Sequence, residues 1–163
     1  MKMKRVLCML LVLLLLPLSA LADVLTEIET YYGSMIHETG GKSLPEKHET
    51  VKKDEGKTQI IYRFSETFVL IYTFDSNGTI TAFSAGCSSE DDYIEFLSVC
   101  NAGLFSVLRD DYNLDVLGDF VFQFISIRNG KEASSKFSFA GNYAYSVERL
   151  DEKRIVLIAV KVE

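Results

Sequence analysis

The chain has 163 residues, 48% hydrophobic and 12% aromatic, which is enough for one domain with a sizeable core and too apolar for a disordered chain. Its 23 acidic residues outnumber its 17 basic ones. This balance excludes nucleic acid and anionic membrane surfaces as expected partners, because binding to either requires clustered lysine and arginine.

The first 22 residues have the pattern of an export signal. A basic start precedes the apolar run 6–16, and Ala20 and Ala22 supply the small residues that signal peptidase requires. The apolar run is short for a membrane span, which makes an uncleaved anchor the less favoured alternative. We therefore predict cleavage after Ala22 and a secreted or extracytoplasmic protein of bacterial type. Its mature part is a single domain, residues 23–163, with 14 basic and 23 acidic residues and a net charge of −9.

The mature part begins with a helix. Apolar residues recur at helical spacing over residues 24–37, and Gly40 and Gly41 end this pattern. Residues 42–57 are polar and predict a loop with at most one short turn.

Strands follow, because the hydrophobic period changes to two. Residues 59–64 alternate between apolar and polar, whereas residues 67–74 are apolar on both faces, as in a covered strand. The turn sequence DSNG at 75–78 leads into a returning strand at 79–85, so this region predicts a hairpin.

The second half of the domain predicts one clear helix and one clear hairpin. Ser89 and the acids after it suggest a capping box that opens a helix with its apolar stripe reaching residue 108. Residues 114–128 fit a helix or a strand, and we favour the helix. Strands at 142–149 and 155–162 form the hairpin, and the second of them is again apolar on both faces.

These elements predict an α+β fold, with an antiparallel sheet of about five strands packed with two or three helices in the order α-β-β-β-α-(α)-β-β. Strands that are apolar on both faces require helices on both sides, a curled sheet, or a second copy of the chain over the outer face. A homodimer is therefore one expectation. Cys87 and Cys100 are expected as buried free thiols, because about eleven helical residues would hold them roughly 16 Å apart, beyond disulfide reach.

Both histidines lie in the stretch HETGGKSLPEKHET, residues 37–50. His37, His48 and Glu49 are the candidate metal ligands, but the histidines are eleven positions apart and lack the helical spacing of a zinc site. We expect a polar loop there and no metal or other cofactor.

Residues 111–122 resemble a calcium-binding loop only in part. Asp111, Asn113 and Asp115 match its first three ligand positions, but Val116 and Phe122 occupy the positions of the essential glycine and glutamate. Turn and helix-cap roles are the expectation for these polar residues.

One cysteine is a candidate catalytic nucleophile. Cys87 lies at a predicted strand-to-helix turn, where a helix end could activate it with His37 or His48 as base, but no nucleophile motif surrounds it. A carboxylate pair is placed by the fold and cannot be located by pattern.

The favoured function is a secreted, non-catalytic binding or interaction domain for a protein or a small ligand outside the cytoplasm. Tyrosine combines apolar area with a polar tip, so an aromatic surface is the expected binding site. The candidates are Tyr31, Tyr32, Tyr62, Tyr143 and Tyr145. The alternatives are a small secreted hydrolase using Cys87 or a carboxylate pair, and a self-associating structural component of the cell envelope.

Overall fold

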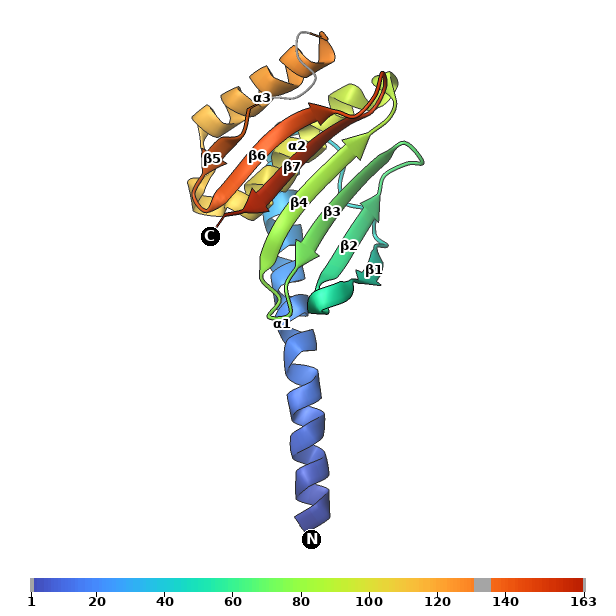
Figure 1. Cartoon of the computed structure of the whole chain (residues 1–163), viewed down its shortest axis with the longest axis vertical. Helices are drawn as coiled ribbons and strands as arrows, with labels where there is room; N and C mark the ends of the chain where they lie inside the picture. Colours follow the sequence, from blue (N-terminus) through green and yellow to red (C-terminus); the bar gives the residue numbers. More distant parts are fainter. Residues whose placement is uncertain (1, 131–135, 163) are drawn as a thin grey trace.

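The computed structural model of this chain describes residues 2–130 and 136–162, with side chains from Leu21 onward. Over these residues it contains three α-helices and one seven-stranded antiparallel sheet, so the fold is α+β (Figure 1). In chain order the elements are α1 (Lys2–Thr39), β1 (Glu49–Lys52), β2 (Thr58–Arg63), β3 (Phe68–Phe74), β4 (Ile80–Cys87), α2 (Tyr93–Leu108), α3 (Leu114–Arg128), β5 (Ser138–Ala140), β6 (Tyr143–Arg149) and β7 (Ile155–Lys161).

The predicted first helix is the C-terminal part of α1. This helix begins at Lys2 and runs through the expected cleavage site after Ala22, and its N-terminal part points away from the sheet in Figure 1. It ends as predicted, because Gly40 follows with φ of +70°, a left-handed conformation that favours glycine. Among the residues whose side chains are described, no helix is long and apolar enough to cross a membrane.

The sheet has seven strands in the order β1-β2-β3-β4-β7-β6-β5, so the predicted count of about five is wrong. The two missed strands, β1 and β5, are the edges, with four and three residues. Such short segments carry no readable alternation, and β1 lies within the stretch predicted as a loop. All five predicted strands are present.

Both predicted hairpins are confirmed, and an aspartate shapes each turn. In the β3–β4 turn, the Asp75 carboxylate accepts hydrogen bonds from the backbone N–H groups of Asn77 and Thr79, at 2.8 and 2.9 Å. In the β6–β7 turn, Asp151 accepts from the N–H groups of Lys153 and Arg154. Aspartate side chains favour such turns because they replace a backbone acceptor.

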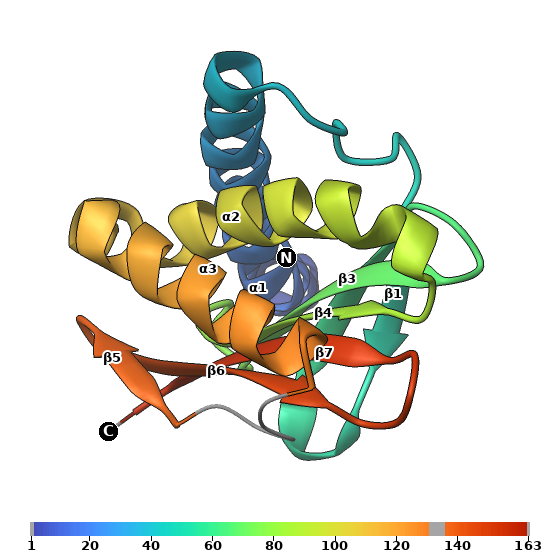
Figure 2. The same ribbon diagram turned by 90° about the horizontal axis from the view of Figure 1, so that it is seen from above.

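The helices gather on one face of the sheet. Figure 2 shows α2 and α3 lying over the same side, with the C-terminal part of α1 crossing behind them. The favoured helix at 114–128 is confirmed as α3. It buries Val116, Phe120, Phe124 and Ile127, which recur every three or four residues, so its helical period outweighs the local strand character.

The start of α2 differs from the prediction. A short 3₁₀ turn, Glu90–Asp92, precedes the helix, and neither Ser89 nor Asp92 forms a side-chain cap. The Asp92 carboxylate instead accepts a hydrogen bond from the Thr67 hydroxyl at 2.6 Å, which joins the end of the β2–β3 turn to α2. A tertiary contact therefore replaces the predicted local cap.

Candidate functional site

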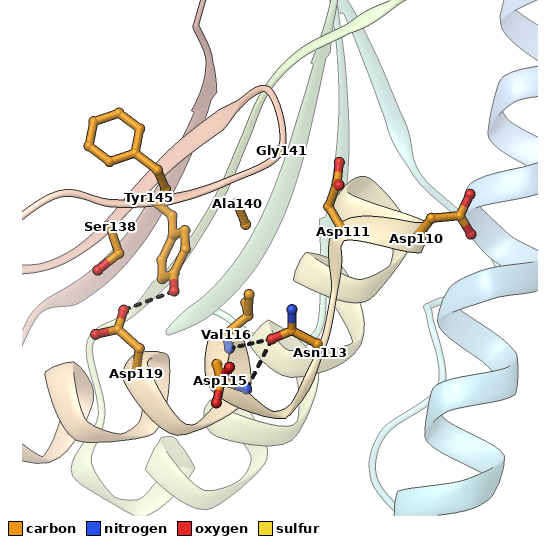
Figure 3. A pocket seen from close by; sticks show the side chains of 11 residues that line it. Asp110, Asp111, Asn113, Asp115, Val116, Asp119, Ser138, Ala140, Gly141 and Tyr145 are labelled. Carbon is orange, nitrogen blue, oxygen red and sulfur yellow. Dashed lines mark hydrogen bonds between the residues drawn. The ribbon is translucent and has the colours of Figure 1, made fainter.

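An open hollow of about 560 Å³ lies between the start of α3 and the β5–β6 hairpin (Figure 3). Four aspartates line it together with neutral polar and aromatic side chains. Its residues are Asp110, Asp111, Asn113, Asp115, Val116, Asp119, Ser138, Phe139, Ala140, Gly141 and Tyr145. The three calcium-like positions of the sequence therefore lie at this hollow.

The aspartates of the hollow do not converge on a common point. Asp110 and Asp111 point in different directions, and Asp111 lies against Gly141, where the left-handed backbone (φ +53°) and the lack of a β-carbon make room for it (Figure 3). The Asn113 oxygen accepts hydrogen bonds from the N–H groups of Asp115 and Val116 at 3.0 and 3.1 Å. Asn113 is thus the N-cap of α3, as the sequence predicted.

Asp119, on the wall of the hollow, ties α3 to the sheet. One oxygen of Asp119 accepts from the Tyr145 hydroxyl at 2.8 Å and from the Gln123 amide at 2.7 Å. The Gln123 oxygen in turn accepts from the N–H of Val147 at 3.1 Å. Burial, followed by the hydrogen bond to this carboxylate, raises the pKa of Tyr145 well above its usual range. These hydrogen bonds hold α3 on β6, so Asp119, Gln123 and Tyr145 have a structural role in the hollow.

The three candidate metal ligands lie in different places. His37 lies in the last turn of α1, whereas His48 precedes β1 and packs its ring 5.4 Å from that of Tyr62. Glu49 pairs with Arg63 at 2.6 Å, and this hydrogen bond lowers the pKa of Glu49. Within the described residues, no group of three or more histidine, cysteine, aspartate or glutamate side chains is arranged to hold a metal ion.

Cys87 is buried at the end of β4 and unbridged, as is Cys100 in α2. The Cys87 thiol donates a hydrogen bond to the backbone oxygen of Ser89 at 3.2 Å. Burial is the main cause that raises the pKa of this thiol, and the nearby Asp92 carboxylate raises it further. An activated cysteine needs the opposite surroundings, because the thiolate is the nucleophile.

Three of the five tyrosines expected at a binding surface lie in the core. Tyr32, Tyr62 and Tyr145 are each 1% exposed, and their hydroxyls donate to the Lys42 oxygen, the Glu29 carboxylate and Asp119. Tyr143 is half-buried and donates to the Ile80 oxygen. Only Tyr31 keeps a surface position, with its ring against Phe105 and beneath the Arg109 guanidinium. Internal acceptors for the hydroxyls let these tyrosines serve as core residues.

A different surface is left open by the fold, and we call it the outer face of the sheet. Along β3, Phe68, Leu70, Tyr72 and Phe74 are buried towards the helices, and the residues between them point the other way and are half-buried. Strand pairing aligns the residues of the outer face in three rows across β1, β2, β3, β4 and β7. They are Val51, Gln59, Ile61, Val69, Ile71, Thr73, Ala82, Ser84, Gly86, Val156, Ile158 and Val160.

The outer face is aliphatic and carries no charge. Seven of its twelve residues are valine or isoleucine. Charged side chains surround them: Arg63 pairs with Glu49, and Glu148 faces Val156. Glu66 and Arg154 lie beside Val69 and Val156, and Lys57, Asp75 and Lys161 lie beside Thr73 and Ala82. At Gly86 a shallow hollow of about 250 Å³ opens beside Val69 and Val156. The face closes at β6, where Ala144 and Ser146 are 5% and 0% exposed. The sequence signal for this surface was the pair of strands that are apolar on both faces.

A second, narrower apolar surface follows α3. Leu114, Phe122 and Ile125 are exposed to 83%, 71% and 47%, and they lie on one side of this helix. Gly118, between them, has nothing within 4 Å of the position of a β-carbon. This stripe is one helix wide, whereas the outer face spans five strands.

Comparison with protein-family models, with curated proteins and with solved structures finds no significant match to this chain.

Proposed function

We propose that this protein is a secreted or extracytoplasmic, non-catalytic interaction domain that binds a protein partner through the outer face of its sheet. The single observation that carries this proposal is the array of half-buried aliphatic side chains across five strands, from Val51 to Val160, over which none of the described helices lies. Contiguous apolar surface of this kind on a folded domain marks an interaction site, because leaving it in water is costly.

A non-catalytic role is favoured by the state of the catalytic candidates. Cys87 is buried, its pKa is raised, and its hydrogen bond goes to a backbone oxygen. The aspartates of the hollow near α3 either take part in local structure or point apart, and Asp119 is engaged by Tyr145 and Gln123. The hydrolase alternative therefore gains no support from these groups.

The proposed location follows from the export-signal pattern of the first 22 residues. A net charge of −9 on the part after Ala22 supports a protein partner over nucleic acid or an anionic membrane. The outer face contains no cation or anion to recognise a charged ligand, so we expect its partner to present an apolar, uncharged surface.

The test places a photo-crosslinking amino acid at Ile158, in the middle row of the outer face, in the producing cells. The control carries the same group at Asn77, which is exposed in the β3–β4 turn. We expect a discrete crosslinked product from position 158 that disappears when Ile71→Lys places a charge on the same row, and no such product from position 77. No product from position 158, or one insensitive to Ile71→Lys, would contradict the proposal.

A further inference from the structure

We infer that the partner of the outer face is a second copy of this chain, so that two sheets pack face to face in a homodimer. This inference rests on the proposed function, because it assumes that the outer face is the binding surface. Stacked sheets pack about 10 Å apart through interdigitating side chains of their inner faces. The outer face offers the branched aliphatic residues that such packing uses.

The charge distribution favours a copy of the same surface. The chain carries a large negative charge, yet the outer face holds none of it. Two copies can therefore meet there without bringing like charges into the contact, and the paired Arg63 and Glu49 lie at the margin. A face whose twelve residues carry no charge and include seven valines and isoleucines can pack against a copy of itself, as a two-fold interface requires.

The sheet edges offer a poorer route to self-association. Edge strands β1 and β5 have only four and three residues, and β1 ends in Lys52. Short and charged edges restrict strand-to-strand pairing between copies. We therefore expect two copies to associate through their outer faces and not through their edge strands.

The size of the outer face is sufficient for a reversible dimer. Five strands about 4.8 Å apart and rows covering about 20 Å give roughly 500 Å² on each copy. Two copies would bury about 1,000 Å² together, which is the lower limit for a specific interface. The dimer should accordingly dissociate on dilution.

The hollow over Gly86 gives the outer face a depression into which a side chain of the facing copy could fit. A β-carbon on Gly86 would lie 3.5 Å from Val156 and 4.0 Å from Val69, so the space beside it is open yet bounded by aliphatic groups. Leu150, which is 54% exposed, lies on its rim. Glu66 and Arg154 also line the hollow, so an aliphatic side chain from the facing copy would contact Val69 and Val156 beside these two charged groups.

The experiment is sedimentation equilibrium of the purified exported protein over a wide concentration range. We expect the mass to rise from one chain to two, and Ile158→Lys to weaken the dimer at least tenfold. Ser84→Lys, at a position that is already polar on the same row, should have the same effect and guards against a folding defect in the first variant. Ile94→Lys, at an exposed position of α2, is the control and should leave the dimer unchanged.

Other outcomes would overturn the inference in distinguishable ways. A monomer at every concentration, with a crosslink from position 158 to a protein of another mass, would reject the homodimer and keep the proposed function. A monomer without any crosslink from position 158 would reject both. A dimer weakened by Phe122→Lys and untouched by Ile158→Lys would move the interface to α3 and also overturn the inference.

Discussion

Gly103 of α2 lies directly against the ring of Phe83 on β4, where a β-carbon would come within 2.6 Å of a ring carbon. Phe83 is fully buried, so its ring has no room to withdraw. This contact sets how closely α2 approaches the sheet.

Gly103→Ala should therefore lower the free energy of unfolding, by about 1–2 kcal/mol, because the overpacking cost exceeds the gain in helix propensity. Gly118→Ala is the matched control, since Gly118 is also inside a helix and nothing lies within 4 Å of its β-carbon position. That change should raise the free energy of unfolding by about 0.5–1 kcal/mol. Urea unfolding checks both, and equal effects would show that Phe83 does not limit the approach of α2.

The Asp119–Tyr145 hydrogen bond links α3 to β6 and should be measurable by a double-mutant cycle. Asp119→Ala removes the acceptor of a buried hydroxyl and should cost about 1–3 kcal/mol in the free energy of unfolding. Tyr145→Phe should cost about 1 kcal/mol, and the two changes together should cost less than their sum by about 1 kcal/mol. Strictly additive losses in chemical unfolding would refute this coupling.

Arg149, on β6, caps the C-terminal end of α3. Its guanidinium donates to the backbone oxygens of Ile127 and Arg128 at 2.6 and 2.7 Å. Arg149→Lys should lower the free energy of unfolding by about 1–2 kcal/mol, because an ammonium group lacks the fork that reaches two carbonyls. Arg63→Lys is the control, since its pair with Glu49 is exposed, and it should cost less than about 0.5 kcal/mol. Comparable losses in both variants would contradict the capping role.

The strands and hairpins could be predicted from the sequence because the pattern that sets them is local. Residues 67–74 are apolar on both faces of the strand, and the sequence DSNG that follows them is typical of a tight turn. The helix at 114–128 was favoured from the spacing of Leu114, Leu117, Val121, Phe124 and Ile125. The side that it buries carries Val116, Phe120 and Phe124, whereas Leu114 and Ile125 are exposed. Strand β5 could not be predicted, because three residues at an edge owe their pairing to β6 alone.

The candidate site was harder to predict because it depends on which face the helices cover. The apolar outer residues of β3 and β7 were visible in the sequence, but the position of α2 over Phe83 was not. The prediction of surface tyrosines also failed for Tyr62 because its hydroxyl has a distant hydrogen-bond acceptor. Tyr62 meets Glu29 across 33 positions, so a residue suited to a surface became a core residue through a distant acceptor.

Thiol reactivity separates the interaction domain from the cysteine hydrolase. Burial raises the pKa of both Cys87 and Cys100, so the native thiols should react with iodoacetamide at pH 8 at least about tenfold more slowly than in the unfolded chain. Mass spectrometry of timed samples gives the rates. Rapid alkylation of Cys87 alone in the folded protein would revive the nucleophile hypothesis.

The buried tyrosines should make the fold sensitive to alkali. Burial is the largest cause that raises the pKa values of Tyr32, Tyr62 and Tyr72 well above their ordinary value in the folded state. Because the folded protein then holds these protons more tightly than the unfolded chain, their contribution to stability is complete below about pH 10. Above that pH the unfolded chain ionises first, and the free energy of unfolding should fall by up to about 1.4 kcal/mol per pH unit for each tyrosine.

Tyr72→Phe isolates one of these groups. Its hydroxyl shares a 2.9 Å hydrogen bond with Ser106 inside the core, and the residue is fully buried. The variant should be less stable at neutral pH but should lose stability less steeply between pH 10 and 11, since one proton fewer separates the folded and unfolded states. Tyr31→Phe, at a ring that is 36% exposed, is the control. Urea unfolding followed by circular dichroism across this pH range measures the slopes, and an unchanged slope in Tyr72→Phe would mean that this hydroxyl titrates alike in both states.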